Sequence, residues 1–370
     1  MERIIIGIDL AKNIFQLHAE NAAGQVLWRE RLRREALEPF LRKLPPALIG
    51  MEACGSAHHW GRVIGALGHE VRLMPAQYVK AYLKRGKSDV RDAEAICEAV
   101  QRANMRFVPI KSIEQQASRS LERARDLLVK QRTQLANAVR GMLAELGIVA
   151  AVGLRGFKTL AAKITAGDSA IPPALLTCLK PLVEQWQALE VHSDALEAEI
   201  VARAKRDEQM KRLMRIPSVG PIIAHALVSA IGDPRRFRTA RDCAAWIGLT
   251  PLNHSSAEKT RIGHISRAGD HSLRRLLVLG AANMARHAKT KPGTGAKPGT
   301  GAKPGTGAKP GTGAKPGEGT KPSAGNAWLH GIMARRPVKI AMIALAAKTA
   351  RIAWALLRSG EDYRPTQAAA

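Results

Sequence analysis

The chain has 370 residues, which is long enough for two or three domains with separate cores. Its 58 Lys and Arg residues against 31 Asp and Glu residues give a formal net charge of +27, which indicates a polyanionic partner and favours nucleic acid over a membrane surface. We expect no window of about 20 apolar residues to span a bilayer, and no secretory signal is recognised. Four scattered cysteines lack zinc-ligand spacing and are interpreted as buried thiols of a cytoplasmic protein.

Residues 1–110 alternate apolar runs with helical patterns. The predicted strands are Ile4–Leu10, Ile14–Ala19, Val26–Arg31, Leu48–Glu52 and Val71–Met74. A turn at residues 22–25 makes the second and third strands a hairpin, and helical segments are expected near residues 35–43 and 59–67. A hairpin followed by strands that alternate with helices predicts a mixed α/β sheet.

Residues 111–210 carry a different pattern, with apolar side chains spaced three or four apart. The first such stripe is Leu121, Ala124, Leu128, Leu135, Val139, Met142 and Leu146, and the second is Leu182, Trp186, Leu189, Leu196, Ile200 and Ala204. This spacing predicts long amphipathic helices of coiled-coil type, with a turn region between Gly153 and Pro173. We expect a spacer or dimerisation element; the alternative is a pair of helices with no role beyond packing.

Residues 211–290 and 323–360 are predicted to form a third, mainly helical unit. Its Pro/Gly turn at 216–221 opens an apolar helix whose N-terminus could bind a phosphate, although a plain turn explains the same residues. Residues 291–322 contain Lys-Pro-Gly-Thr-Gly-Ala hexads and are expected to be a flexible insertion, either a repeat expansion within a loop or a basic tether. Residues 361–370 are expected to be a disordered tail.

Four acidic residues stand out in the first quarter of this basic chain. Asp9 and Glu52 each end an apolar strand, whereas Asp89 and Asp92 are three residues apart and would share one face of a helix. Carboxylate oxygens are the ligands that Mg²⁺ prefers. A single acid at a strand end is often a cap or turn residue, and a helical pair can be a solvated face. The combined placement favours a metal site.

A second candidate site lies in the C-terminal third. Ser255 and Ser256 follow Pro251-Leu252-Asn253-His254, and cationic residues come soon after them. A hydroxyl amid positive charge suits attack on a phosphate, because the charge stabilises both the alkoxide and the transition state. Serines in loops are also common turn formers, and basic loops are often simple phosphate clamps.

Several motifs together resemble one known family, the DEDD transposases of the IS110 group of bacterial insertion sequences. The matching segments, in order, are Gly7-Ile8-Asp9-Leu10-Ala11-Lys12, Glu52-Ala53-Cys54-Gly55, Ser88-Asp89-Val90-Arg91-Asp92-Ala93, Gly248-Leu249-Thr250-Pro251, Ser255-Ser256, Arg261-Ile262-Gly263-His264-Ile265-Ser266-Arg267 and Leu273-Arg274-Arg275-Leu276-Leu277. The resemblance covers nearly the whole chain apart from the hexads. One local departure is Ala257-Glu258, where similar proteins commonly have a glycine pair.

The resemblance implies an N-terminal RuvC-like domain of RNase H fold, a helical coiled-coil spacer and a mainly α C-terminal transposase domain. It also implies a Mg²⁺-dependent enzyme that cuts and rejoins DNA at element ends and target through a C-terminal serine, guided by a bridge RNA and acting as a dimer or tetramer. Carried onto this chain, the metal ligands are Asp9, Glu52, Asp89 and Asp92, and the nucleophile is Ser256 or Ser255, with Ser256 favoured. Contacts with nucleic acid are expected from Lys259, Arg261, His264, Arg267, Arg274 and Arg275. The expected location is the bacterial cytoplasm, on the nucleoid when DNA is bound.

Two other functions fit part of the pattern. The first is a RuvC-like, structure-selective nuclease in which metal-activated water attacks and the serine only contacts a phosphate. The second is a non-catalytic packaging protein, which would suit the charge and the basic helices. The hexads add the question of whether this copy is active.

Overall fold

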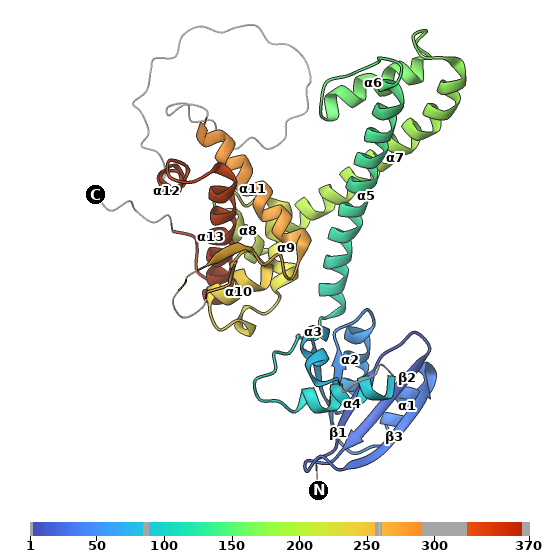
Figure 1. Ribbon diagram of the computed structural model, residues 1–370, viewed down its shortest axis with the longest axis vertical. Coiled ribbons are helices and arrows are strands. Elements are labelled where there is room, and N and C mark those ends of the chain that lie inside the picture. The colour runs from blue at the N-terminus through green and yellow to red at the C-terminus, as the bar shows by residue number, and fades with distance from the viewer. Residues whose placement is uncertain (1–2, 84–88, 256–258, 260, 290–323, 365–370) are drawn as a thin grey trace. The chain divides into compact units, whose positions relative to one another are not determined.

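A five-stranded mixed sheet forms the centre of the N-terminal unit (Figure 1). The computed structural model describes residues 3–83, 89–255, 259, 261–289 and 324–364. The chain divides into two compact units, Met1–Ala117 and Ser118–Ala370. Each unit is described by itself below.

The sheet order is β3-β2-β1-β4-β5. Its strands are β1 (Ile5–Asp9), β2 (Ile14–Glu20), β3 (Val26–Arg33), β4 (Leu48–Glu52) and β5 (Glu70–Met74). The strand pairs β1–β2 and β2–β3 are antiparallel, and β1–β4 and β4–β5 are parallel. The mixed sheet predicted from the sequence is therefore confirmed.

Helices cover both faces of this sheet. They are α1 (Leu37–Leu41), α2 (Ala57–Ala66), α3 (Ala76–Val79) and α4 (Asp89–Val100), with short 3₁₀ turns at Arg34–Ala36 and Lys80–Tyr82. Because successive strand residues point to opposite faces, Ile6 and Ile8 pack with α1 and α2, whereas Ile5 packs with α4. Asp9 has the parity of Ile5, so the end of β1 presents its carboxylate on the α4 side.

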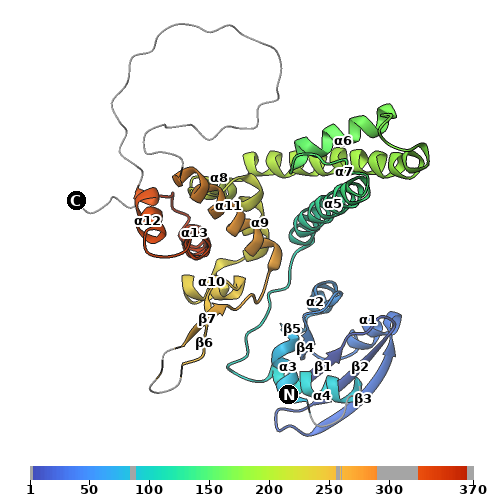
Figure 2. The same ribbon diagram turned by 45° about the horizontal axis from the view of Figure 1, so that its top comes forward.

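Three helices in the second unit share a small core. They are α5 (Ile113–Ala144), α6 (Leu154–Ala166) and α7 (Pro173–Arg206), and α6 lies along α7 (Figure 2). The turn predicted between Gly153 and Pro173 was therefore wrong, because α6 occupies most of that stretch. Gly153 at φ 94° and Gly167 at φ 70° bound the helix, and its buried Phe157 and Leu160 pack into the shared core.

Helix α5 does not bury the stripe that the sequence indicated. Of the seven stripe residues only Val139 is buried; Met142 and Leu146 are exposed. The coiled-coil spacer is accordingly not confirmed. The C-terminal end of α5 instead buries Ala136, Val139 and Leu143, which pack with α6 and α7.

The other end of α5 buries polar side chains in an ionic network with the C-terminal helices. Arg119 forms ion pairs with Glu122 and Asp270. Glu122 Oε1 also accepts hydrogen bonds from His225 Nδ1 (2.7 Å) and Ser229 Oγ. These groups come from α5, from α9 and from the residue that caps α11, so the network ties α5 to the C-terminal helices within the second unit.

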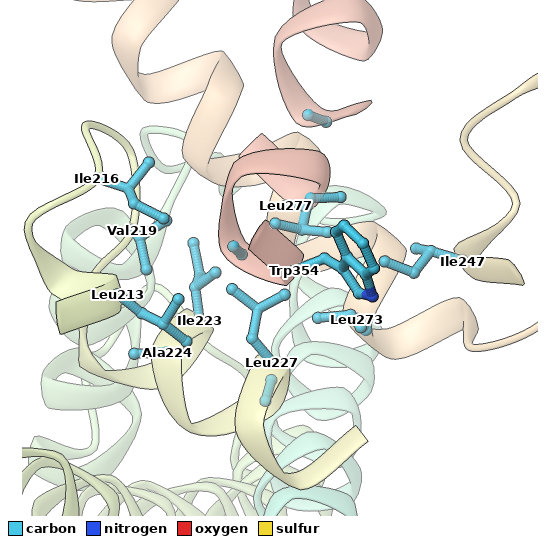
Figure 3. Close-up of a cluster of buried hydrophobic side chains, with 14 of the residues drawn as sticks. Leu213, Ile216, Val219, Ile223, Ala224, Leu227, Ile247, Leu273, Leu277 and Trp354 are labelled. Carbon is cyan, nitrogen blue, oxygen red and sulfur yellow. The ribbon is translucent and has the colours of Figure 1, made fainter. Parts of the chain in front are cut away.

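The C-terminal part of this unit is mainly helical. Its elements are α8 (Glu208–Met214), α9 (Pro221–Ile231), a 3₁₀ turn (Pro234–Arg236), α10 (Ala240–Ile247), the hairpin β6 (Pro251–Asn253) and β7 (Ile262–Ile265), α11 (His271–Lys289), α12 (Ala324–Met333) and α13 (Val338–Ser359). Figure 3 shows the core, in which Leu227 of α9, Leu273 of α11 and Trp354 of α13 meet. The predicted hexad insertion (291–322) and most of the predicted tail (365–370) lie outside the described residues.

Two expectations drawn from composition need correction. Helix α13 is long and apolar enough to cross a membrane, with a window of mean hydropathy 1.6, although no such window was expected. Its apolarity matches its place in the core, where Ala346, Ala350 and Ala353 are fully buried. The cysteines are also not uniformly buried: Cys97 and Cys243 are, whereas Cys54 and Cys178 are exposed.

Candidate active site

Three predicted metal ligands meet at the end of β1. Asp9 is the last residue of that strand, and Asp89 and Asp92 lie in the first turn of α4. One carboxylate oxygen from each lies within 4.8 Å of the other two. We call these three residues together with Glu52 the acidic cluster.

Close packing of α4 on the sheet brings the acids together. A Cβ on Gly7 would lie 2.1 Å from the carbonyl oxygen of Ala93 and 2.5 Å from the nitrogen of Cys97. Only glycine at this strand position allows the helix backbone to approach so closely. The same close approach fixes the position of α4 along β1, so that the first turn of the helix lies near Asp9.

Glu52 ends the neighbouring strand β4, which is parallel to β1 with Ile8 opposite Met51. It lies outside the group of three, but its charge contributes to the raised pKa of Asp9. Parallel strands end at the same edge of a sheet, so the sequence could place Asp9 and Glu52 together without knowing any distance.

Electrostatics in the acidic cluster are unfavourable to a full set of negative charges. Burial raises the pKa of Asp9 to about 6, and repulsion from Asp92, Asp89 and Glu52 adds to this rise. Burial, followed by repulsion from Asp92, also raises the pKa of Glu52. Over the part of the chain that is described, no Lys or Arg forms an ion pair with any of the four. The donor set consists only of carboxylate oxygens, which fits a hard divalent cation.

Sequence reasoning missed one cation near this cluster. Lys80 lies in the 3₁₀ turn after α3, and its charge lowers the pKa of Glu52 against the effects of burial and Asp92. The signal that could have found it is topological. The segment after β5 leaves the same edge of the sheet as β1 and β4, so a lysine soon after that strand is a candidate neighbour of the site.

Of the two candidate serines the structure describes Ser255, which belongs to the other unit and follows β6 of the β6–β7 hairpin. Ser255 is exposed, and its hydroxyl donates to Asn253 Oδ1 and accepts from Arg261 N at 3.0 Å. Asn253 Oδ1 also accepts from Ser255 N at 3.0 Å. The Ser255 hydroxyl is therefore engaged in holding the hairpin loop. Ser256 lies outside the described residues.

The six cationic residues predicted to contact nucleic acid fall into two groups. Lys259, Arg261, His264 and Arg267 are exposed on or after the hairpin. Arg274, in contrast, is buried and donates to the carbonyl oxygens of Ile247 (2.8 Å) and Ala268 (2.6 Å). It holds the segment between α10 and α11, so a direct phosphate contact does not fit its position. Arg275 is partly exposed and donates to Asp126 at 2.7 Å.

The sheet order and the carboxylates at its edge define a class, the RNase H-like enzymes of DEDD type. The comparisons with known proteins agree. A family model described as "Transposase", for the DEDD transposases of IS110 type, matches residues 6–148. A second, described as "Transposase IS116/IS110/IS902 family", matches residues 210–293.

Relatives match along almost the whole chain. The protein y4pF/y4sB of Sinorhizobium fredii is 42% identical over 99% of this chain and 87% of its own length. A Pseudomonas aeruginosa protein named "Probable family 20 transposase" is 41% identical over 97% of this chain and 98% of its own length. The "Transposase for insertion sequence element IS1111A" of Coxiella burnetii is 36% identical over 97% of this chain and 91% of its own length. The chain belongs to the IS110/IS116/IS902 family of insertion-sequence transposases.

Membership of this family settles several broader questions. The chain is a DNA transposase, it acts on the DNA of element ends, and its DEDD domain implies dependence on a divalent metal. A purely structural role in packaging nucleic acid is therefore not supported.

Proposed function

We propose that this transposase is a Mg²⁺-dependent DNA recombinase in which the acidic cluster and Ser256 act together on the scissile phosphate. The observation that carries the proposal is the meeting of three carboxylates within 4.8 Å at the end of β1, where burial and then repulsion from the neighbouring acids raise the pKa of Asp9 to about 6. Such a cluster is stable as a fully ionised set only when a cation neutralises it.

Asp9, Asp89 and Asp92 would hold the metal, and Glu52 would complete the set from β4. When bound, Mg²⁺ supplies charge neutralisation at the phosphate and at the oxygens that attack and leave. The half-buried position of Asp9 keeps bulk water from screening that charge. Lys80, on the Glu52 side, supplies a further positive charge at the edge of the cluster.

Ser256 is the better nucleophile of the two serines, because the Ser255 hydroxyl already donates to Asn253 and accepts from Arg261. In the proposed step the Ser256 oxygen attacks phosphorus and loses its proton to solvent. The bond between phosphorus and the departing DNA oxygen breaks, and that oxygen leaves as a protonated hydroxyl. A DNA hydroxyl then attacks the phosphoserine, which joins the strands and regenerates the serine.

Exposed cations near the serines would stabilise the developing charge. Lys259, Arg261 and Arg267 lie on or just after the hairpin, and all three are exposed. Arg267 has a left-handed backbone (φ 55°), and its N–H donates to the carbonyl of Gly248 at 3.3 Å. This contact fixes the chain direction where the hairpin returns to the helices.

The assembly in this proposal is a dimer or tetramer directed by a bridge RNA. The acidic cluster and the serines belong to different units of the chain, so protomers that exchange units would each complete a site. RNA that co-purifies with the protein tests the guide. A defined RNA from DNA flanking its gene supports it, and bulk unselected RNA contradicts it.

Covalent trapping tests the serine step. Wild-type protein is incubated with end-labelled element DNA and Mg²⁺, then resolved on a denaturing gel. We expect a protein–DNA adduct in the wild type and in Ser255→Ala, and none in Ser256→Ala. Cleavage by Ser256→Ala without any adduct in the wild type would instead identify a nuclease that uses metal-activated water.

A further inference from the structure

We propose that an arginine-rich turn between α9 and α10 is a second nucleic-acid-binding surface of this transposase, specific for backbone phosphates. This arginine turn is defined by Arg235, Arg238 and Arg241, with Arg358 of α13 beside it. The proposal rests on the nucleic-acid-directed activity of the chain, and it concerns binding away from the hairpin that carries the serines.

The three arginines of the turn are exposed and uncompensated. Arg235, Arg238 and Arg241 are all exposed, and none pairs with an acid among the residues whose positions are known. Exposed arginines elsewhere commonly do find an acid one turn away, as in the pairs Arg42–Glu38, Arg102–Glu98 and Arg203–Glu199. Free guanidinium groups concentrated in a short segment are typical of a phosphate-binding surface.

The acids within the turn are occupied with the backbone. Asp233 Oδ1 accepts from Arg235 N at 2.9 Å and caps the 3₁₀ turn. Asp242 Oδ2 accepts from Thr239 N at 3.0 Å, and Thr239 Oγ1 accepts from Asp242 N at 3.2 Å, which is a capping box for α10. These bonds shape the turn, and the carboxylates stay with backbone N–H groups while the guanidinium groups remain free.

Helix α13 fixes the turn from the other side. Trp354 Nε1 donates to the carbonyl of Pro234 at 2.9 Å. Arg358 donates to the carbonyl of Arg238 at 3.3 Å and stacks over Trp354 at 5.1 Å from the ring centroid. A turn held in one conformation loses little entropy when it binds a ligand, so its charges are preorganised.

Arg236 is a buried arginine that helps to hold the turn in place. Its guanidinium lies 4.4 Å from the ring centroid of Phe237 and 4.3 Å from that of Trp246. Its Nε and Nη2 are buried without a hydrogen-bond partner in the described parts of the chain, and burial lowers its pKa to about 10. The two aromatic rings, which act through cation–π contact, therefore stabilise it in place of acceptors. Arg236 supports the turn and is not offered to a ligand.

The arginine turn and the β6–β7 hairpin lie at opposite ends of α10. Helix α10 has 8 residues; Arg241 lies in its first turn, and Gly248, where the chain turns toward β6, caps its other end. A helix of this length spans about 12 Å, and a DNA duplex carries one backbone charge per about 1.7 Å of its axis. A nucleic acid that passes the hairpin along α10 would therefore bring several phosphates past the arginine turn.

The test uses the full-length protein with Arg235→Gln, Arg238→Gln and Arg241→Gln combined. Binding is measured by fluorescence anisotropy in EDTA, with a labelled duplex DNA of about 30 base pairs and with a labelled single-stranded RNA of about the same length, over a salt series. Loss of three phosphate contacts is expected to reduce the slope of log K against log salt by about 2.7 for the duplex and about 2 for the single strand. At 0.1 M salt, binding should weaken on the order of 100-fold.

A matched triple variant controls for bulk charge. Lys130→Gln, Arg155→Gln and Lys180→Gln remove the same charge from exposed positions of α5, α6 and α7, and none of these residues forms an ion pair with a described acid. A smaller slope confined to the arginine-turn variant, with either probe, supports the proposal, and the probe affected identifies DNA or RNA as the ligand. Unchanged slopes with both probes, or an equal loss in the control variant, overturn it.

A loss of binding can be distinguished from a loss of folding and from a loss of catalysis. The melting temperature of the triple variant should match that of the wild type, because none of the three side chains forms an ion pair with a described residue. If it falls, Arg241→Gln alone should still lower the duplex slope by about 0.9. Binding in EDTA needs neither metal nor serine, so a failure here differs from failure of the recombinase mechanism.

Discussion

Two groups of acidic side chains occupy this basic chain, and they differ in what neutralises them. In the second unit, Glu122 and Asp270 meet Arg119, and Glu122 also accepts from His225 and Ser229. In the first unit, the acidic cluster of Asp9, Glu52, Asp89 and Asp92 has no ion pair with any described residue. The acids of the ionic network are thus paired with a cation, whereas those of the acidic cluster are not paired with any described one.

Burial sharpens this difference. Arg119 and Glu122 are 9% and 7% exposed, so their mutual pairing is needed to keep two charges in the interior. The acidic cluster is half-buried to exposed, and none of the described Lys or Arg residues pairs with it. Beside the ionic network lies a pocket of about 430 Å³, lined by Arg119, Arg123, Asp126, Asp270, His271 and Ser272. Both acids of this pocket form ion pairs with arginines. A satisfied group of acids is structural, whereas a self-repelling group is prepared for a cation.

The largest expected effect separates the two groups by activity. Asp9→Asn removes a carboxylate of the acidic cluster and should slow strand cleavage on the order of 10³-fold, because the metal and the phosphate lose their positioning. Single-turnover cleavage of labelled element DNA measures this. Cleavage at the wild-type rate would show that the cluster is as structural as the network.

The network should show the opposite profile. Glu122→Gln removes one of the two carboxylates that pair with Arg119 and the carboxylate oxygen that accepts from His225 and Ser229, so it should destabilise the second unit by about 2 kcal/mol. Urea unfolding measures the change in free energy. A loss below about 1 kcal/mol would mean that the network contributes little, and the contrast would then rest on the acidic cluster alone.

Divalent metal should stabilise the first unit in a pH-dependent way. At a Mg²⁺ concentration 100 times its Kd, the stabilisation is about 2.7 kcal/mol. Protons compete with metal once the pH falls below the Asp9 pKa of about 6, so the rise in melting temperature should be clear at pH 7.5 and much smaller at pH 5. Equal shifts at both pH values would place the metal elsewhere.

The smallest effect concerns the metal-free protein. The pKa of Asp9 is raised from 3.8 to about 6, so its contribution to stability is present in full below pH 3.8 and is lost as the pH rises through 6. Asp9→Asn should therefore be more stable than the wild type at pH 7.5 in EDTA, by about 1 kcal/mol after allowance for solvent screening. The difference should vanish near pH 4. A destabilised variant at pH 7.5 would contradict the repulsion.

Much of the first unit was predictable because its signals are local. The strand Ile5–Asp9 follows from a continuous apolar run, and the meeting of Asp9 and Glu52 follows from the shared edge of parallel strands. The i, i+3 placement of Asp89 and Asp92 follows from helix geometry. The close approach of α4 at Gly7 was not predicted, because it depends on which helix covers that strand.

The second unit was less predictable, because its decisive contacts join distant residues. Phe157 and Leu160 carry a helical spacing, but the flanking Gly153 and Pro173 are residue types that also favour a turn. Arg274 follows the core residue Leu273 in α11, and only the fold shows that its guanidinium reaches the carbonyl of Ile247. The pairing of Glu122 with His225 spans 103 residues, and no local pattern signals it.

Manganese binding tests the central contrast most directly. Mn²⁺ is titrated into the wild type, Asp9→Asn and Glu122→Gln, and the free ion is followed by electron paramagnetic resonance. Each variant removes one carboxylate charge, so bulk electrostatics are matched. The wild type and Glu122→Gln should bind Mn²⁺ alike, and Asp9→Asn should lose the tight site. Equal binding by all three proteins would contradict the assignment of the acidic cluster as the metal centre.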